Sequence, residues 1–480
     1  MPPSSTNRPH DVRPSGAAAM ADSTFSGARA LAESGLLRLA AATGTREARR
    51  HPSYLLAFGF GTSVVMWGIG FACRLPPVWV PSAILLFLLL GCQLVGGFLA
   101  SRSTGVGVRA GVGVGVMSAF INLLVLGSLL GDQSALVPTA SIWVPGSLVA
   151  GALLGGIGGV LGRPRRFGTA APDIPALHPP LWTGRFAQVA ALATLLLLVV
   201  GGMVTSKQAG LAVVDWPNSF GYNMFLFPLS KMTGGVYFEH SHRLFGALVG
   251  LTTLVLAIHL QFADPRRWVR TLAIVALVMV IGQGILGGLR VTGYFTTSTD
   301  PNMTAPSLLL ALVHGVFGQV FFATLVALAA VTSPSWQILP AAELRADAGK
   351  DHVWTAWAVG LVVPQLVVGA LYRHFEGGLA IHLSLAVFVA MTVFVAGIRG
   401  FGLHPESPLY TKLGKILVAL ISLQILLGFG ALTVVTLSRN APEPPIYDVI
   451  VATAHQATGA TVLAVSTLMF VWSRRLFRRA

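Results

Sequence analysis

Long apolar runs separated by short polar segments dominate the chain. A helix needs about 20 apolar residues to cross the hydrocarbon core of a bilayer. Twelve runs approach or exceed that length, near 54–72, 79–101, 108–131, 142–162, 187–206, 242–262, 270–289, 306–332, 353–371, 378–398, 414–435 and 450–473. None shows strand-like alternation, and helices satisfy their backbone polar groups in lipid without closing a barrel. The pattern predicts an all-α polytopic membrane protein with about 12 transmembrane helices.

Composition narrows the class of protein further. Of the 480 residues, 54% are hydrophobic and only 10% are charged, whereas an ordinary soluble protein carries about 25% charged residues. This excludes a soluble enzyme, a disordered protein and a coiled coil. The two cysteines are too few for a disulfide framework, a cysteine-ligated zinc site or an iron–sulfur centre. No CxxCH motif is present, which excludes covalent c-type haem.

The net charge of +15 is explained by topology. If both termini lie in the cytoplasm, most of the lysines and arginines fall in cytoplasmic segments, and the whole excess lies on that face. This is the positive-inside pattern of membrane proteins, so we expect no nucleic-acid partner. It predicts a multi-pass protein of the inner (plasma) membrane with both termini cytoplasmic. The mitochondrial inner membrane is less favoured, because acidic residues weaken any transit-peptide character in the first 53 residues.

The distribution of chemistry along the chain predicts several parts. The first four spans offer almost no ionisable groups, and a Pro-rich basic segment follows them. The last eight spans read as two copies of a four-helix unit. The predicted parts are a cytoplasmic tail (1–53), a four-span accessory membrane part (54–163), a cytoplasmic linker (164–186), a first four-helix bundle (187–332) and a second four-helix bundle (333–480).

Three pairs of segments support the duplication. VVGGMVTSKQAGLAV (199–213) aligns with VVGALYRHFEGGLAI (367–381), IGQGILGG (281–288) resembles LQILLGFG (423–430), and HGVFGQVFFATL (314–325) aligns with HQATGATVLAVS (455–466). With four helices in each unit, the repeats are parallel in topology. Internal repeats in membrane proteins place a functional site within or between the halves, and a four-helix bundle can hold a cofactor on facing helices.

Four histidines lie at matched depth in this arrangement. His242, His314, His382 and His455 each occupy the outer part of an even-numbered span, two in each repeat. Ionisable residues within spans are costly and usually functional. One such histidine could simply bond a neighbouring carbonyl, but four at one depth indicate ligands. The other histidines, His404 among them, fall in tails, loops or span ends and are read as solvated or interfacial.

Two histidines per bundle suit the axial ligands of haem iron. A small residue follows each histidine by one turn, on the same helix face, which leaves room for a flat porphyrin; these are Gly246, Gly318, Ala386 and Gly459. Glu239 and His242 have the Glu-x-x-His spacing of di-iron sites, but those sites need further glutamates within the spans, and the chain has none there. Glu239 is then either an interfacial carboxylate at a helix start or an acid/base group at the haem edge.

Several motifs resemble those of haem A synthase, the Cox15/CtaA family. GLAVVDWPNSFGYNMFLFPLSKMTGGVYFEHSHRLFGALVG (210–250) is similar to its first outer loop and second core helix. GGLRVTG (287–293), LVHGVFG (312–318), GGLAIHLSLA (377–386) and VATAHQATGA (451–460) resemble later core segments. The resemblance covers about 187–473. Bacterial members often carry a cysteine pair in the first outer loop, and 207–238 has none.

The resemblance implies a reaction and a set of roles. The family oxidises one porphyrin methyl of haem O to a formyl group, by a hydroxylation and then a second oxidation to a diol that loses water. His242 and His314 would bind the substrate haem, His382 and His455 a haem b cofactor, and Glu239 would be the essential carboxylate. Arg243, Lys207, Arg290 or Arg373 could pair with the haem propionates.

Two other functions stay open from the sequence. A bis-His dihaem b-type cytochrome would only pass electrons, and it would not need Glu239 or the long outer loop. A transporter of haem or another solute, built on parallel repeats, should show broken helices and polar groups at mid-membrane. For the enzyme, the expected partners are haem O, the lipid bilayer, haem O synthase, an electron donor and further copies of the chain.

Overall fold

The computed structural model describes residues 52–76, 78–125, 136–163, 180–292, 308–339 and 343–479. Twelve helices in these ranges are long and apolar enough to cross a membrane. Each overlaps one of the apolar runs of the sequence, so the predicted fold class is confirmed. Nearly all of the predicted tail and most of the predicted linker lie outside the described residues.

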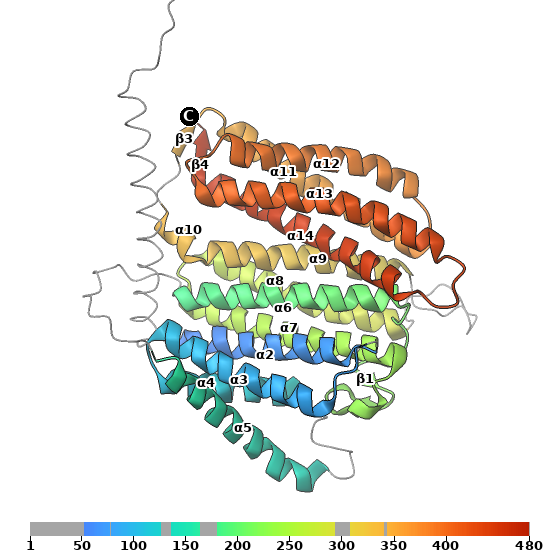
Figure 1. The fold of residues 1–480 in the computed structure, drawn as a ribbon. Coiled ribbons are helices and arrows are strands. Elements are labelled where there is room, and N and C mark those ends of the chain that lie inside the picture. Colours follow the sequence, from blue (N-terminus) through green and yellow to red (C-terminus); the bar gives the residue numbers. More distant parts are fainter. Residues whose placement is uncertain are drawn as a thin grey trace, which may run out of the picture.

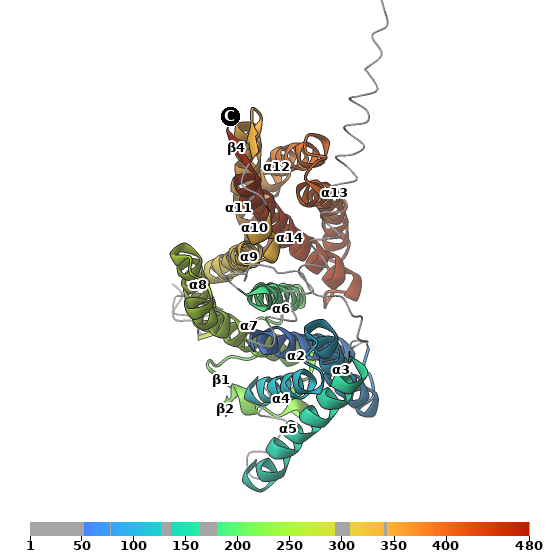
Figure 2. The same cartoon turned by 90° about the vertical axis from the view of Figure 1, so that its left-hand side faces the viewer.

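The helices form three groups that follow one another in space (Figures 1 and 2). The accessory part contains α2 (Ser53–Arg74), α3 (Ser82–Thr104), α4 (Val108–Val125) and α5 (Leu136–Leu161). The first bundle contains α6 (Leu181–Ser206), α7 (Gly234–Ala263), α8 (Arg267–Thr292) and α9 (Leu308–Val331). The second contains α11 (Ala348–Phe375), α12 (Leu379–Gly402), α13 (Pro408–Leu437) and α14 (Ile446–Leu476).

Contacts between neighbouring helices close both four-helix units. In the first bundle α6 packs on α7, α7 on α8, α8 on α9 and α9 on α6, and α11 to α14 repeat this ring. The bundles meet where α9 contacts α11 and α14, and where α6 contacts α14. The first bundle begins at Leu181 rather than at 187, because the polar start of α6 still forms helix after Pro180.

Short segments cover the two ends of the helices. An antiparallel pair, β1 (Asn218–Ser219) and β2 (Tyr222–Asn223), and two 3₁₀ turns, η2 (Met224–Leu226) and η3 (Leu229–Lys231), lie in the loop between α6 and α7. At the opposite end lie α10 (Pro334–Ile338) and a parallel pair, β3 (Glu343–Arg345) with β4 (Phe477–Arg479) (Figure 1). We call these the β1 end and the C-terminal end.

The accessory part shares a hydrophobic core with the first bundle. Its helix α2 packs on α6 and α7. Trp67 meets Phe245 edge-on at 5.6 Å between ring centroids, and Phe71 stacks on Tyr237 at 5.4 Å. The Tyr237 hydroxyl also donates a 2.6 Å hydrogen bond to the Phe71 carbonyl. These contacts brace the outer side of α7, the helix that carries Glu239 and His242.

His404 is not the solvated residue that the sequence suggested. It is 1% exposed, its Nε2 lies 2.9 Å from Oδ2 of Asp351, and its ring stacks on Phe477 at 4.2 Å. Arg399 donates from Nε to the other oxygen of Asp351 at 2.8 Å. The loop after α12 folds back onto the C-terminal strand, so His404 ties the C-terminal end of the second bundle together.

Candidate haem-binding site

The four predicted histidines form two facing pairs. The rings of His242 (α7) and His314 (α9) have centroids 6.2 Å apart, and those of His382 (α12) and His455 (α14) are 6.4 Å apart. Two metal–imidazole bonds of about 2 Å each, plus half a ring at either side, place two centroids about 6 Å apart. Both spacings therefore fit two axial ligands on one iron.

Each histidine packs against a glycine of the preceding helix. A Cβ added at Gly201 or Gly369 would lie 2.9 Å from Cε1 of His242 or His382, respectively. A Cβ added at Gly287 would lie 3.3 Å from Cε1 of His314, and one added at Gly428 would lie 3.1 Å from Cε1 of His455. A side chain at Gly201 or Gly369 would force the ring to move, and one at Gly287 or Gly428 would crowd it. The molecule thus contains four similar hairpins, each with a glycine facing a histidine.

This arrangement refines the repeat seen in the sequence. The structurally equivalent glycines of α8 and α13 are Gly287 and Gly428, which shifts the ungapped pairing of 281–288 with 423–430 by one residue. The small residues one turn after the histidines differ in their surroundings. A Cβ at Gly246 would meet no atom within 4 Å, whereas one at Gly318 or Gly459 would meet a glutamine side chain at 3.6 or 3.2 Å.

Glu239 lies one turn before His242 and is 6% exposed. Its Oε1 accepts a 3.2 Å hydrogen bond from Arg243, while its Oε2 is buried without a partner among the described residues. Helix α7 begins at Gly234, eight residues before the predicted start, so Glu239 and His242 share one helix face at i and i+3. The first bundle therefore has a buried carboxylate beside its histidine pair.

Arg243 fastens the loop between α6 and α7 to this site. Besides Glu239, it donates to the carbonyl oxygens of Val213, Asp215 and Asn218 at 2.7, 2.6 and 2.9 Å. A guanidinium has five N–H donors. Both terminal nitrogens of Arg243 are engaged by the loop carbonyls and Glu239. The expectation that Arg243 could bind a propionate does not fit this geometry.

Sequence reasoning did not identify His240 as the second anchor of that loop. It is 1% exposed, its Nδ1 lies 3.1 Å from the Ser219 hydroxyl, and its ring lies 4.7 Å from that of Phe227. The sequence does contain a signal for this role. His240 lies two residues before His242 on α7, so its side chain must face another way. The loop also lays the Trp216 ring against Gly288, where an added Cβ would clash with the indole.

The other three predicted propionate partners, Lys207, Arg290 and Arg373, also lie at the β1 end. Lys207 donates to the Pro444 carbonyl at 3.3 Å and Arg373 to the Thr205 carbonyl at 3.1 Å, so both bridge the two bundles. Arg290 lies against Gly210, and its Nε is buried without a partner among the described residues. Arg290 therefore keeps a buried donor that no described residue uses.

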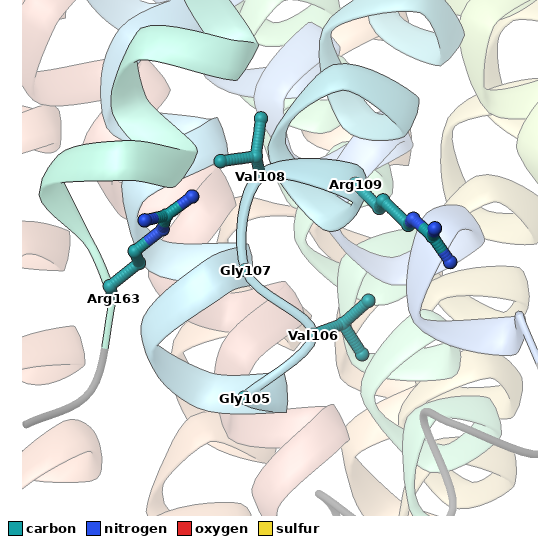
Figure 3. A pocket seen from close by; sticks show the side chains of 6 residues that line it. All are labelled: Gly105, Val106, Gly107, Val108, Arg109 and Arg163. Carbon is teal, nitrogen blue, oxygen red and sulfur yellow. The ribbon is translucent and has the colours of Figure 1, made fainter. Parts of the chain in front are cut away.

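One surface hollow lies away from the histidine pairs. One open hollow of about 520 Å³ lies at the turn between α3 and α4 and is lined by Gly105, Val106, Gly107, Val108, Arg109 and Arg163 (Figure 3). Gly105 and Gly107 have φ of 65° and 78°, which makes this turn tight. Both arginines are exposed. The hollow lies in the part of the chain where the sequence predicted no chemistry.

Within the described residues, no cluster of three or more histidine, cysteine, aspartate or glutamate side chains could hold a bare metal ion. Each pair of histidines supplies two ligands, which suits a metal held in a cofactor that provides its remaining ligands. The fold and site define a polytopic helical membrane protein with two histidine-paired four-helix bundles.

Comparison with known families agrees with that class. Residues 184–384 match the family model COX15-CtaA, cytochrome oxidase assembly protein. This span covers the first bundle and the start of the second, less than half of the chain, and it agrees with the motifs that resemble the Cox15/CtaA family. No curated protein matches the chain.

Proposed function

We propose that this protein is a haem A synthase, which oxidises a ring methyl of haem O to a formyl group in two steps to give haem A for terminal oxidases. One observation carries the proposal most strongly. Two histidine pairs have nearly the same spacing, but their carboxylates differ among the described residues. Glu239 is buried one turn from His242 with Oε2 unpaired, whereas Asp448 lies two turns before His455 and accepts a hydrogen bond from Ser438. Two equivalent electron-carrying sites would not need this difference.

The donor set fits haem in both bundles. The Nδ1 atoms of His242, His314 and His455 are buried without partners, and the open space at Gly246 adjoins the first pair. In this proposal His242 and His314 hold the substrate haem O, and His382 and His455 hold haem b. When bound, haem b supplies a one-electron relay between a donor and the first bundle.

The residues around the first pair divide the remaining tasks. Glu239 accepts or donates a proton at its free Oε2, which is the atom that no other group occupies. Arg243 keeps the other oxygen, Oε1, in place. Arg290 offers its unused Nε–H to an anionic group such as a propionate. The loop held by Arg243 and His240 covers the β1 end and excludes water.

The proposal extends to the setting of the protein. The chain is a multi-pass membrane protein. We place it in the inner (plasma) membrane with both termini cytoplasmic and the β1 end outside, on the charge distribution. The haem O would arrive from a haem O synthase, an electron donor would re-reduce haem b, and copies of the chain would associate in the bilayer. The histidine-bearing helices are continuous, which argues against a transporter built on broken helices.

The test is haem extraction and mass analysis after expression with and without a haem O synthase. Haem A should appear only when haem O is supplied. His242→Ala should abolish haem A and retain haem b, whereas His382→Ala or His455→Ala should lose haem b. A purified protein with two haem b groups per chain, and no haem A despite a haem O supply, would instead identify a dihaem electron carrier.

A further inference from the structure

A glutamine stands one turn before the histidine-facing glycine in three of the four hairpins. Gln283 precedes Gly287, Gln365 precedes Gly369, and Gln424 precedes Gly428, each by four residues. Residues four apart lie on one face of a helix, so each glutamine faces the same histidine pair as its glycine. The fourth hairpin has Leu197 at this position, four residues before Gly201.

The glutamine side chains reach the histidines or the turn below them. The Gln365 amide nitrogen lies 3.1 Å from Nδ1 of His382 and 3.1 Å from its carbonyl oxygen. The Gln424 amide nitrogen lies 3.5 Å from Nε2 of His455. The Gln283 side chain lies beside Gly318, one turn after His314.

Each amide keeps one buried atom without a partner: Nε2 of Gln283, Oε1 of Gln365 and Oε1 of Gln424. An imidazole that binds a metal through one nitrogen carries its proton on the other, and that N–H needs an acceptor to fix the ring. A terminal amide can present oxygen or nitrogen by turning over. The unpaired Oε1 of Gln365 or Gln424 can accept such an N–H, and Gln283 presents its oxygen once the amide turns over.

His242 has no such partner. Its Nδ1, like those of His314 and His455, is buried without a partner among the described residues. What differs is the residue at the glutamine position, because Leu197 packs in the apolar core with no polar atom to offer. The missing amide falls on the helix pair that also carries Glu239. In the second bundle, each histidine thus has a glutamine on the helix that faces it. In the first bundle, only His314 has one.

We infer that the three glutamines are positioning residues for the imidazole ligands, and that Leu197 leaves His242 as the ligand that dissociates most readily. An exogenous diatomic ligand then binds the first-bundle haem on the side of His242, next to Glu239. This inference deepens the proposed function and rests on it, since it assumes haem in the first bundle.

Carbon monoxide titration of the reduced, haem-loaded full-length protein tests the inference by absorption spectroscopy, independently of turnover. The wild type should bind CO at the first-bundle haem only. Leu197→Gln should raise the half-saturating CO concentration roughly fivefold, the factor expected of one neutral hydrogen bond. The matched control is Leu196→Gln on the same helix, because Leu196 points toward Gly68 of α2 and should leave CO binding unchanged.

The reverse substitution gives a second, independent readout. Gln365→Leu or Gln424→Leu should allow the second-bundle haem to bind CO and should alter its low-spin spectrum. The inference is overturned if Leu197→Gln and Leu196→Gln bind CO alike, or if both glutamine variants still exclude it. If haem content shows no haem that depends on His242 and His314, the proposed function itself fails, and this inference with it.

Discussion

Arg243 shows how one residue can serve both fold and site. Its guanidinium joins three carbonyl oxygens of the loop before α7 to one carboxylate oxygen of Glu239. The pair Arg243–Glu239 is almost fully buried, with both side chains 7% exposed. Breaking such a pair leaves an uncompensated charge, so charge and shape must be separated in any test of Glu239.

Glu239→Gln makes that separation. The glutamine oxygen can still accept from Arg243, while the second oxygen is replaced by an amide that does not take up a proton. We expect haem A formation to fall roughly a hundredfold or more, in the range of general acid–base effects, with haem b content unchanged. Extracted haems are quantified by mass analysis. Normal haem A output would assign Glu239 to the interface alone.

Asp215 provides a pH-dependent feature of the same loop. Its carboxylate accepts from the amides of Phe220 and Gly221 at 2.7 and 2.8 Å. Partial burial would raise its pKa, but these hydrogen bonds, together with the charge of Arg243, hold the pKa of Asp215 below its ordinary value of 3.8. A lowered pKa in the folded loop means that the ionised form stabilises it.

We therefore expect full protection of the Phe220 and Gly221 amides above the ordinary pKa of Asp215, and loss of protection as pH falls through the lowered value. Hydrogen exchange of these amides, corrected for the intrinsic rate, measures this. Asp215→Asn should weaken protection at neutral pH and remove the pH dependence. An acid transition of the same size in Asp215→Asn would assign it to another group.

At the scale of elements, the repeated unit is a helical hairpin in which a glycine faces a histidine. The hairpins α6–α7, α8–α9, α11–α12 and α13–α14 all have it. The contact gives a reason for glycine, which weakens helices, at these four positions. A helix interior prefers alanine to glycine by about 1 kcal/mol, and at these four positions glycine leaves the space that the imidazole ring occupies.

Gly369→Ala tests this relation in the second bundle. The added methyl group would lie 2.9 Å from Cε1 of His382, so the ring must move. Overpacking typically costs about 1–3 kcal/mol, and we expect haem b to be held roughly tenfold more weakly. Haem titration of the purified protein measures the change.

Gly360→Ala is the control for that substitution. Gly360 lies on the same helix, α11, and a Cβ there would meet no atom within 4 Å. It should bind haem b as the wild type does, with unchanged or slightly greater stability. Equal losses of haem b in both variants would mean that the helix, and not the contact with His382, is responsible.

At the scale of the whole molecule, the accessory part is a brace. Its four helices supply no histidine or acidic side chain among the described residues, yet α2 packs along α6 and α7. Figure 2 shows the accessory helices on one side of the first bundle and the second bundle on the other. The accessory part therefore contacts α7, the helix of Glu239 and His242, from the side of the first bundle opposite the second bundle.

A protein that starts at Leu181 with an added methionine should still insert and make haem A, because the proposed site lies wholly within α6–α14. It loses the Phe71–Tyr237 and Trp67–Phe245 contacts, and its melting temperature should fall by several degrees. Both are measured on membrane fractions with verified, haem-loaded protein. A correctly oriented, haem-loaded truncation without haem A formation would give the accessory part a role in catalysis or substrate delivery.

The sequence by itself determined the twelve spans and the four histidines at one depth. Span length is set by the thickness of the bilayer, and lipid leaves the backbone no alternative to helix, so local hydropathy is sufficient. Haem ligation by these histidines stays a prediction that the paired rings support. Only the tertiary structure decided which side chains meet across helices: the glycine behind each ring, Arg243 engaged by the loop, and His404 buried against Asp351. Such contacts depend on how each helix is rotated and on how the loops fold back. They bring together residues that are distant in the chain, so no single segment specifies them.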